Sequence, residues 1–260
     1  LVTPFDLNGN IDFTALEHLV NYVTEGGVDY LVALGTTAET PTLSPQERDM
    51  VIDHIRKVNA EKLPLIVGIG GNNTAAVIAS ISKCDLSGVS AVLSVTPFYN
   101  KPTQRGLYEH YKAIAAKSPL PIILYNVPSR TGVNMLPETT LRLAHDFNNI
   151  VAIKEACGDL EQFRELISGR PEGFAVISGD DAIALPLVEM GGDGVISVAG
   201  NAFPEHMSGM IGAAFAGLTE KARDMDASIK EMVKALFEEG NPAGVKAALN
   251  AKGIASNVLR

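Results

Sequence analysis

Lys154 ends a run of four apolar residues, Ile150 to Ile153, and is followed directly by Glu155. A lysine amine at the end of a buried strand loses hydration, which disfavours the ammonium and favours the nucleophilic free amine. Such an amine can form a Schiff base with a carbonyl substrate. The alternative is a lysine that reaches solvent or pairs with Glu155. Alternation along a strand weakens that pairing, because it directs Glu155 to the opposite face.

Tyr125 ends the apolar run Ile122–Tyr125, at the matching height of the preceding predicted strand. A phenol beside a Schiff-base lysine can carry protons during imine formation. The alternative is a tyrosine at the rim of a core, with its ring buried and its hydroxyl in water.

Three further residues offer contacts for an anionic substrate. Thr36 and Thr37 follow the apolar run Tyr30–Leu34 and supply two hydroxyls, suited to a carboxylate or a proton relay. Ordinary turn chemistry is the alternative for them. Arg130 lies five residues after Tyr125 and could bind a carboxylate with both arms of its guanidinium. The commoner fate of an arginine is the surface.

Short apolar runs and amphipathic stretches alternate along the chain. Eight runs predict strands: Leu1–Thr3, Tyr30–Leu34, Leu65–Ile69, Ala91–Val95, Ile122–Tyr125, Val151–Lys154, Ala175–Ser178 and Val195–Val198. Helical spacing predicts helices at Phe13–Thr24, Pro45–Asn59, Thr103–Lys117, Glu138–Phe147 and Asp159–Ile167. The alternation predicts an α/β protein with a parallel sheet. Eight units favour a (β/α)8 TIM barrel, whose active site lies at the C-terminal ends of its strands.

The predicted barrel spans residues 1–203, and residues 204–260 read as added C-terminal helices, for example Lys221–Phe237 and Ala243–Leu249. The first residue, Leu1, is not Met and lies in a predicted strand, so we expect the sequence to be a fragment.

Composition excludes several classes of protein. With 260 residues and 46% hydrophobic content, the chain can bury a full core and does not read as disordered. A net charge of −9 argues against nucleic-acid binding. The two cysteines, Cys84 and Cys157, fit a reducing cytoplasmic setting. No apolar run reaches the roughly 18 residues of a membrane span, and no export signal opens the chain.

The other notable motifs read as structural. The glycine-rich segment Gly68–Asn73 does not match the dinucleotide-binding pattern. All five histidines fall on predicted helices, so we expect no metal site. Asp180 and Asp181 could bind a hard cation, but adjacent carboxylates at a helix start more often cap the helix.

The strand-end motifs together resemble the dihydrodipicolinate synthases of the N-acetylneuraminate lyase superfamily, which are class I aldolases. The resemblance covers Leu1 to Arg260, and Tyr-Asn-Val-Pro-Ser-Arg-Thr-Gly at 125–132 is its most specific segment. The other segments are Gly35-Thr36-Thr37-x-Glu39, Thr96–Asn100, Ile153–Glu155 and Ser178–Asp181. Members of the family continue past the end of this chain, so the resemblance also implies a truncated C-terminus.

The resemblance implies condensation of pyruvate with aspartate 4-semialdehyde, the first committed step towards lysine and diaminopimelate. Lys154 would form the imine with pyruvate, and Tyr125 would carry protons. Thr36 would link Tyr125 to Tyr99, which would enter from a neighbouring subunit of a homotetramer, a dimer of dimers. No metal or organic cofactor would be needed.

The resemblance also implies residues that bind the substrates. Thr37 and nearby backbone would bind the pyruvate carboxylate, and Arg130 would orient the carboxylate of the semialdehyde. Gly179 and Ile196 would provide backbone contacts around the imine.

The sequence departs from the family at three positions. Ala38 replaces the usual glycine of the Gly-x-x-Gly-Glu turn, which should preserve the loop if φ is not positive there. Lysine-sensitive members tend to carry a glutamate and a tyrosine where this chain has Ala76 and Phe98. Loss of both polar groups predicts weak inhibition by lysine.

Three alternative functions stay open. A sister aldolase or dehydratase acting on a sugar acid is disfavoured by Arg130 and the second threonine. A catalytically silent barrel is disfavoured by the joint presence of Lys154, Tyr125, Thr36 and Tyr99. A phosphate-binding barrel is disfavoured by the acidic residues after the seventh predicted strand.

Overall fold

The computed structural model describes all 260 residues and divides the chain into two compact units. The terminal unit contains both ends of the chain, residues Leu1–Val67 and Ser197–Arg260. The central unit is Gly68–Ile196. The residues expected to do chemistry are divided between them: Thr36 and Thr37 belong to the terminal unit, whereas Tyr125 and Lys154 belong to the central unit.

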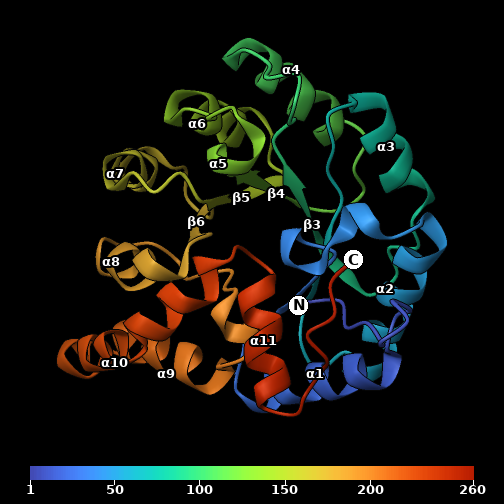
Figure 1. The fold of residues 1–260 in the computed structure, drawn as a ribbon. Coiled ribbons are helices and arrows are strands. Elements are labelled where there is room, and N and C mark those ends of the chain that lie inside the picture. Colours follow the sequence, from blue (N-terminus) through green and yellow to red (C-terminus); the bar gives the residue numbers. More distant parts are fainter. The chain divides into compact units, whose positions relative to one another are not determined.

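The terminal unit combines two short parallel strands with helices from both ends of the chain. Its elements are α1 (Phe13–Glu25), β1 (Leu31–Ala33), η1 (Thr36–Ala38), η2 (Thr40–Thr42), α2 (Pro45–Asn59), β2 (Leu65–Gly68), η4 (Ala199–Asn201), α9 (Pro204–Phe215), α10 (Thr219–Glu238) and α11 (Ala243–Ala251). Strand β1 pairs in parallel with β2, Leu31 opposite Leu65. Helix α10 packs against both α9 and α11 (Figure 1).

Local signals fix where the first helices begin. Asp12 caps α1 by accepting a hydrogen bond from the Ala15 amide at 2.9 Å. At the start of α2, the Ser44 hydroxyl and the Glu47 carboxylate each accept from the other residue's backbone N–H, which is the expected capping box. Pro45 occupies the first helical position, where its missing N–H costs no hydrogen bond.

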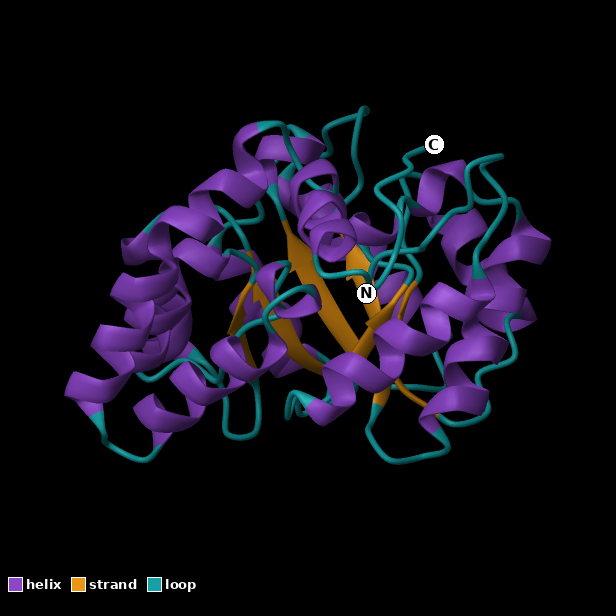
Figure 2. Ribbon diagram, turned by 60° about the horizontal axis from the view of Figure 1, so that its bottom comes forward, coloured by secondary structure: helices purple, strands orange, loops and turns teal.

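The central unit is a four-stranded parallel sheet with helices outside it. Its elements are α3 (Thr74–Lys83), β3 (Val89–Val95), α4 (Gln104–Ala115), β4 (Ile122–Asn126), α5 (Pro128–Thr131), α6 (Pro137–Asp146), β5 (Ile150–Glu155), α7 (Leu160–Gly169), β6 (Ala175–Ser178), η3 (Asp181–Ile183) and α8 (Ala184–Glu189). The strands pair in chain order, β3-β4-β5-β6. Figure 1 shows α3, α4, α6 and α7 outside these strands, and Figure 2 draws the strands in orange and the helices in purple.

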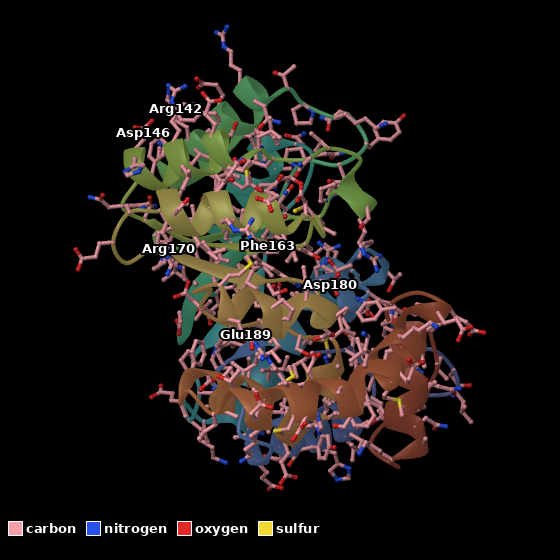
Figure 3. All side chains as sticks on the ribbon, turned by 90° about the vertical axis from the view of Figure 1, so that its left-hand side faces the viewer. Arg142, Asp146, Phe163, Arg170, Asp180 and Glu189 are labelled. Carbon is pink, nitrogen blue, oxygen red and sulfur yellow. The ribbon has the colours of Figure 1, made fainter.

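One face of each central strand packs against the helices. Leu124 and Ile153 belong to the buried cluster that also contains Tyr111 of α4 and Phe163 of α7. Phe163 is fully buried, whereas Arg142 and Asp146 of α6 lie together at the edge of the view in Figure 3 and form an exposed ion pair. The opposite strand face, which carries Tyr125 and Lys154, is free to hold chemistry.

Two of the eight predicted strands are absent. Residues Leu1–Thr3 form no ladder: the Leu1 amine donates to the Val32 carbonyl of β1, but the Val2 amide then donates to the Asn201 side chain and the Thr3 hydroxyl to the Ala38 carbonyl. Residues Val195–Val198 contribute only one bridge, between Val195 and Ser178, before the chain turns into η4. Side-chain hydrogen bonds and an early turn therefore replace the expected pairing.

The helix predictions hold within a few residues where they were made, and Pro45–Asn59 coincides with α2. Helices α3 and α8 were not predicted. Thr74–Lys83 is rich in small and β-branched residues and has no charge pattern, so its helical nature rests on the Asn73 cap and on burial of Val77 and Ile81. None of the helices is both long and apolar enough to span a membrane.

Candidate active site

Tyr125 and Lys154 stand side by side on adjacent strands. They are register partners of β4 and β5, and the Lys154 Nζ lies 4.4 Å from the centre of the Tyr125 ring. Lys154 is only 7% exposed and Tyr125 6%. The sequence prediction that these residues lie at matching heights is confirmed, and a primary amine lies over a tyrosine ring with both residues almost fully buried.

Gly179 gives Lys154 the space it occupies. A Cβ atom at residue 179 would lie 3.0 Å from the Lys154 Cε and 2.8 Å from the Ala156 Cβ, so no side chain fits there. The Gly179 N–H donates to the Glu155 carbonyl at 2.7 Å, and the Ile196 N–H donates to the Ser178 carbonyl at 2.9 Å. These bonds occupy both N–H groups, so any backbone contact of Gly179 or Ile196 with a substrate is left to their carbonyl oxygens.

Glu155 points away from Lys154, as strand alternation predicts, and enters a buried polar network. Its carboxylate accepts from the Asn126 side chain at 2.9 and 3.0 Å, from the Gln162 side chain at 2.9 Å and from the Cys157 amide at 2.8 Å. Burial raises the pKa of Glu155, and these hydrogen bonds act in the opposite direction.

Cys157 is unsuited to nucleophilic chemistry. Burial, together with the nearby Glu155 carboxylate, raises the pKa of its thiol to about 12. The thiolate, which is the reactive form, is therefore disfavoured near neutral pH.

Arg130 and Tyr99 lie on exposed segments of the central unit. Arg130 is exposed on α5, a single helical turn that ends at Gly132 with a left-handed φ of 74°. Tyr99 is 89% exposed and has a φ of 72°, an uncommon conformation for a large side chain. Its loop is tied down on both sides, since Asn72 donates to the Phe98 carbonyl and Asn100 donates to the Asn72 carbonyl.

Thr36 and Thr37 form the turn η1 of the terminal unit, and this turn is held by the C-terminal part of the chain. The Asn241 side chain donates to the Thr37 hydroxyl at 2.9 Å across 204 positions of sequence. Ala38 is buried without a positive φ, which confirms that alanine can replace glycine there. The left-handed residue is instead Glu39, with φ 54°.

Glu39 is anchored by a buried lysine. The Nζ of Lys246 lies 2.5 Å from the Glu39 Oε1 and donates to the Val258 carbonyl at 2.8 Å. Lys246 is fully buried; burial lowers its pKa and Glu39 acts in the opposite direction. The backbone N–H of Arg260 donates to the second Glu39 oxygen at 2.9 Å. Sequence reasoning missed Lys246, although a lone lysine beside Val245 and Leu249 on an apolar helix face was an available signal.

The acidic residues after β6 serve a local purpose. The Asp180 side chain accepts from the Ala182 amide at 2.9 Å and caps η3, as expected for a capping carboxylate. Asp180 is labelled in Figure 3. No group of three or more His, Cys, Asp or Glu side chains is placed to hold a metal ion.

The sequence matches the model of the Dihydrodipicolinate synthetase family over residues 1–260. The chain belongs to this family. Relatives named 4-hydroxy-tetrahydrodipicolinate synthase match it throughout. That of Azobacteroides pseudotrichonymphae genomovar. CFP2 is 52% identical over 260 residues, 100% of this chain and 88% of that protein. That of Bacillus subtilis (strain 168) is 47% identical over 255 residues, 98% of this chain and 88% of that protein.

Solved structures agree with this membership. The dihydrodipicolinate synthase of Thermotoga maritima is similar with a TM-score of 0.98 and 44% identity, covering 100% of this chain and 89% of that chain. A variant described as the first monomeric dihydrodipicolinate synthase is similar with a TM-score of 0.97 and 44% identity, covering 100% of this chain and 87% of that chain. The family resemblance inferred from the strand-end motifs is thus confirmed.

Proposed function

We propose that this protein condenses pyruvate with L-aspartate 4-semialdehyde to give 4-hydroxy-tetrahydrodipicolinate, the first committed step of lysine and diaminopimelate synthesis. The observation that carries the proposal is the buried contact between the Lys154 amine and the Tyr125 ring at the ends of adjacent strands, in a chain that belongs to the family. An amine and a phenol in contact supply a nucleophile and a proton carrier for imine chemistry.

The reaction begins with attack of the Lys154 amine on the pyruvate carbonyl, followed by loss of water to give an imine. Loss of a methyl proton then gives an enamine, which attacks the aldehyde carbon of the semialdehyde. The amine of the substrate closes the ring by attacking the imine carbon, and this step releases Lys154. Tyr125 carries the protons, and Thr36 links it to Tyr99. The imine itself serves as the electron sink, so the proposal needs neither a metal nor an organic cofactor.

Substrate binding falls to residues around this pair. Thr37 binds the pyruvate carboxylate together with nearby backbone, and Arg130 orients the carboxylate of the semialdehyde, as a planar guanidinium suits. Gly179 and Ile196 provide backbone contacts around the imine through their carbonyl oxygens, since their N–H groups are already bonded within the protein.

We also propose a closed barrel for the chain and a tetramer for the assembled protein. Residues 1–203 follow the (β/α)8 barrel plan, with Leu1–Thr3 and Val195–Val198 in the places of the first and last strands although neither forms a ladder, and residues 204–260 form a helical region packed on the barrel. The protein acts in the cytoplasm as a homotetramer, a dimer of dimers, in which Tyr99 crosses to the neighbouring active site. The 89% exposure of Tyr99 in an isolated chain supports that role. Because a monomeric variant exists in the family, the assembly needs its own test.

A coupled assay tests the reaction. Pyruvate and the semialdehyde are supplied, the product is passed to a dihydrodipicolinate reductase, and consumption of NADPH is followed. We expect turnover in the native protein and loss of both turnover and borohydride-trapped pyruvate imine in Lys154→Ala. Trapped imine without semialdehyde turnover would move the substrate to a sugar acid such as N-acetylneuraminate. No trapped imine would remove Lys154 from the chemistry.

Subunit mixing tests the shared site. Lys154→Ala and Tyr99→Phe proteins, each nearly inactive alone, should regain part of the activity when mixed, because some sites then combine an intact lysine with an intact tyrosine. Exchange is confirmed by native mass spectrometry. Confirmed exchange without recovered activity would exclude a contribution of Tyr99 across the interface.

We further propose weak feedback by lysine. Ala76 and Phe98 lack the carboxylate and phenol that would bind an ammonium and a carboxylate. Titration of the coupled assay with lysine measures it, and half-inhibition below millimolar lysine would contradict the proposal.

A further inference from the structure

The pairing of β4 with β5 changes register within the strands. Ile122 is opposite Ile150, but Ile123 is opposite Ala152, so Val151 is an extra residue between the two pairs. Burial confirms the bulge: Ile150 and Ile153 both lie in the helix-facing cluster although they are three residues apart. In a regular strand, residues three apart face opposite sides.

The bulge decides which residue faces Tyr125. With it, Tyr125 is opposite Lys154 and Asn126 is opposite Glu155. Continuing the pairing of Ile122 with Ile150 without an extra residue would place Ile153 opposite Tyr125. A slip of one residue turns every side chain to the other face, so Lys154 would point to the helices. Bulges next to active sites re-aim side chains in this way.

The apolar side chains provide little defence against that slip. Residues Ile150 to Ile153 are all aliphatic, and an isoleucine or a valine fits either face of a strand buried on both sides. A polar contact specific to one register is therefore needed next to the reacting pair.

Asn126 and Glu155 make that contact. They directly follow Tyr125 and Lys154, are both 0% exposed, and face the helices. The Asn126 amide donates to both Glu155 oxygens at 2.9 and 3.0 Å, while its own Oδ1 accepts from the Met135 amide at 3.0 Å. Gln162 of α7 donates to the same carboxylate at 2.9 Å. A slip would break all these bonds within a buried region, where unpaired polar groups are costly.

We propose that Asn126 and Glu155 are positioning residues that hold Lys154 opposite Tyr125 in the bulged register. This inference rests on the proposed function, since it concerns the geometry of the same reaction. It assigns the two residues no contact with substrate; they act through the strands that carry the nucleophile and the phenol.

Glu155→Gln and Asn126→Asp test the proposal singly. The first replaces one of the two accepting oxygens with an NH2 group that faces donors, and the second places two carboxyl groups together, so each disrupts the bridge with little change in volume. We expect kcat to fall by roughly 10²-fold, the effect of a displacement of about 1 Å at a reacting centre, with little change in KM for pyruvate. Should either protein not fold, Asn126→Ser removes the bridge without adding charge and should show the same kcat loss.

The double variant Asn126→Asp with Glu155→Gln separates positioning from general stability. In this variant the amide at position 155 can donate to the carboxylate at position 126, the reverse of the native direction. We expect kcat to rise at least about tenfold above that of the single variants. Leu166→Ala, which shortens a buried side chain of α7 outside the bridge, is the matched control. It should lower the melting temperature while leaving kcat nearly unchanged.

Native protein is measured first for imine trapping and turnover. Absence of both would refute the proposed function rather than the bridge. With an active native protein, single variants that fold and keep native kcat would overturn the positioning role. A folded double variant that regains no activity would overturn it as well.

Discussion

The two units hold their candidate residues in different ways. In the central unit, Tyr125 and Lys154 sit on hydrogen-bonded strands, and the residues beside them are bridged by an amide and a carboxylate. In the terminal unit, Thr37 lies on a short turn that is held by groups far along the chain, Asn241 and the Lys246–Glu39 ion pair. The ladder joins the strands through many equivalent bonds and leaves the choice of register to the bridge, whereas the turn depends entirely on a few charged and polar contacts.

The difference teaches where each unit is vulnerable. Removal of the Asn126–Glu155 bridge in the central unit leaves strands that can still pair but no longer favours the bulged register, so the expected cost falls on alignment and hence on rate. Removal of Lys246 in the terminal unit leaves the Glu39 carboxylate nearly buried and without a counter-charge, so the expected cost falls on the stability of the fold.

The largest expected effect on stability is at Lys246. Lys246→Met keeps most of the side-chain volume but leaves the nearly buried Glu39 without its cation. Breaking a buried pair in this way costs about 3–5 kcal/mol of unfolding free energy. Urea unfolding followed by circular dichroism measures it. Lys246→Met with Glu39→Gln should recover most of the loss, and native stability of the single variant would show that the pair does not anchor the turn.

The two units should lose stability over different ranges of pH. Burial lowers the pKa of His110, in α4, from its usual 6.5 to about 4. Between about pH 4 and pH 6.5, His110 therefore binds a proton in the unfolded chain but not in the folded chain. The stability that this histidine contributes is present above about pH 6.5 and is lost as the pH falls through 6.5 towards 4. At about pH 5 the loss is about 2 kcal/mol.

The terminal unit should respond at lower pH. Hydrogen bonds from the Arg260 side chain and the Ser44 amide lower the pKa of Glu47 to about 2, so its contribution is present above about 4.5 and is lost as the pH falls towards 2. In the central unit, burial raises the pKa of Glu155, so its protonation at low pH stabilises the folded state. This change is opposite in sign to that of His110.

The readout is therefore the difference between native protein and His110→Gln, unfolded in urea at about pH 7 and about pH 5. The variant should lose less stability over this interval than native protein does. Equal losses would mean that His110 is not the group responsible.

The smallest expected effect is at Thr37. Thr37→Val removes the hydroxyl that accepts from Asn241 at 2.9 Å and that we propose contacts the pyruvate carboxylate. A hydrogen bond contributes about 1 kcal/mol, so KM for pyruvate should rise roughly fivefold. Thr37→Ser, which keeps the hydroxyl, is the control and should stay near native. A native KM in Thr37→Val would remove the hydroxyl from substrate binding.

The residues on the strands could be predicted from the sequence, because a strand buried on both faces gives a continuous run of apolar residues. The apolar runs before Tyr125 and Lys154 predicted both strands, and the strand ends predicted that the two side chains meet. The same continuity concealed the bulge at Val151, because Val-Ala-Ile has no polar residue whose place could reveal the register. The first predicted strand failed for a different reason: its only bond to a strand runs from the Leu1 amine to the Val32 carbonyl, and its next bonds go to the Asn201 side chain and the Ala38 carbonyl.

The anchors of the turn were beyond local reasoning. Thr36 and Thr37 could be named from their place after a strand, but Asn241 lies 204 positions from its partner. The apolar neighbours of Lys246 in α11 indicate that it is buried, but not that its partner is Glu39, 207 positions earlier. Contacts between distant segments depend on tertiary packing, which no pattern within a window of residues contains.

The extra residue at Val151 also matters when an activity is assigned to a related gene from its sequence. A homologue that lacks one residue between the strand start and the lysine would keep every motif and nearly all of its identity score. Its nucleophile would nevertheless be buried among the helices, and its gene would still be given the family's activity. Counting the residues of this segment is therefore a direct check on whether a related gene encodes an active enzyme or a silent copy.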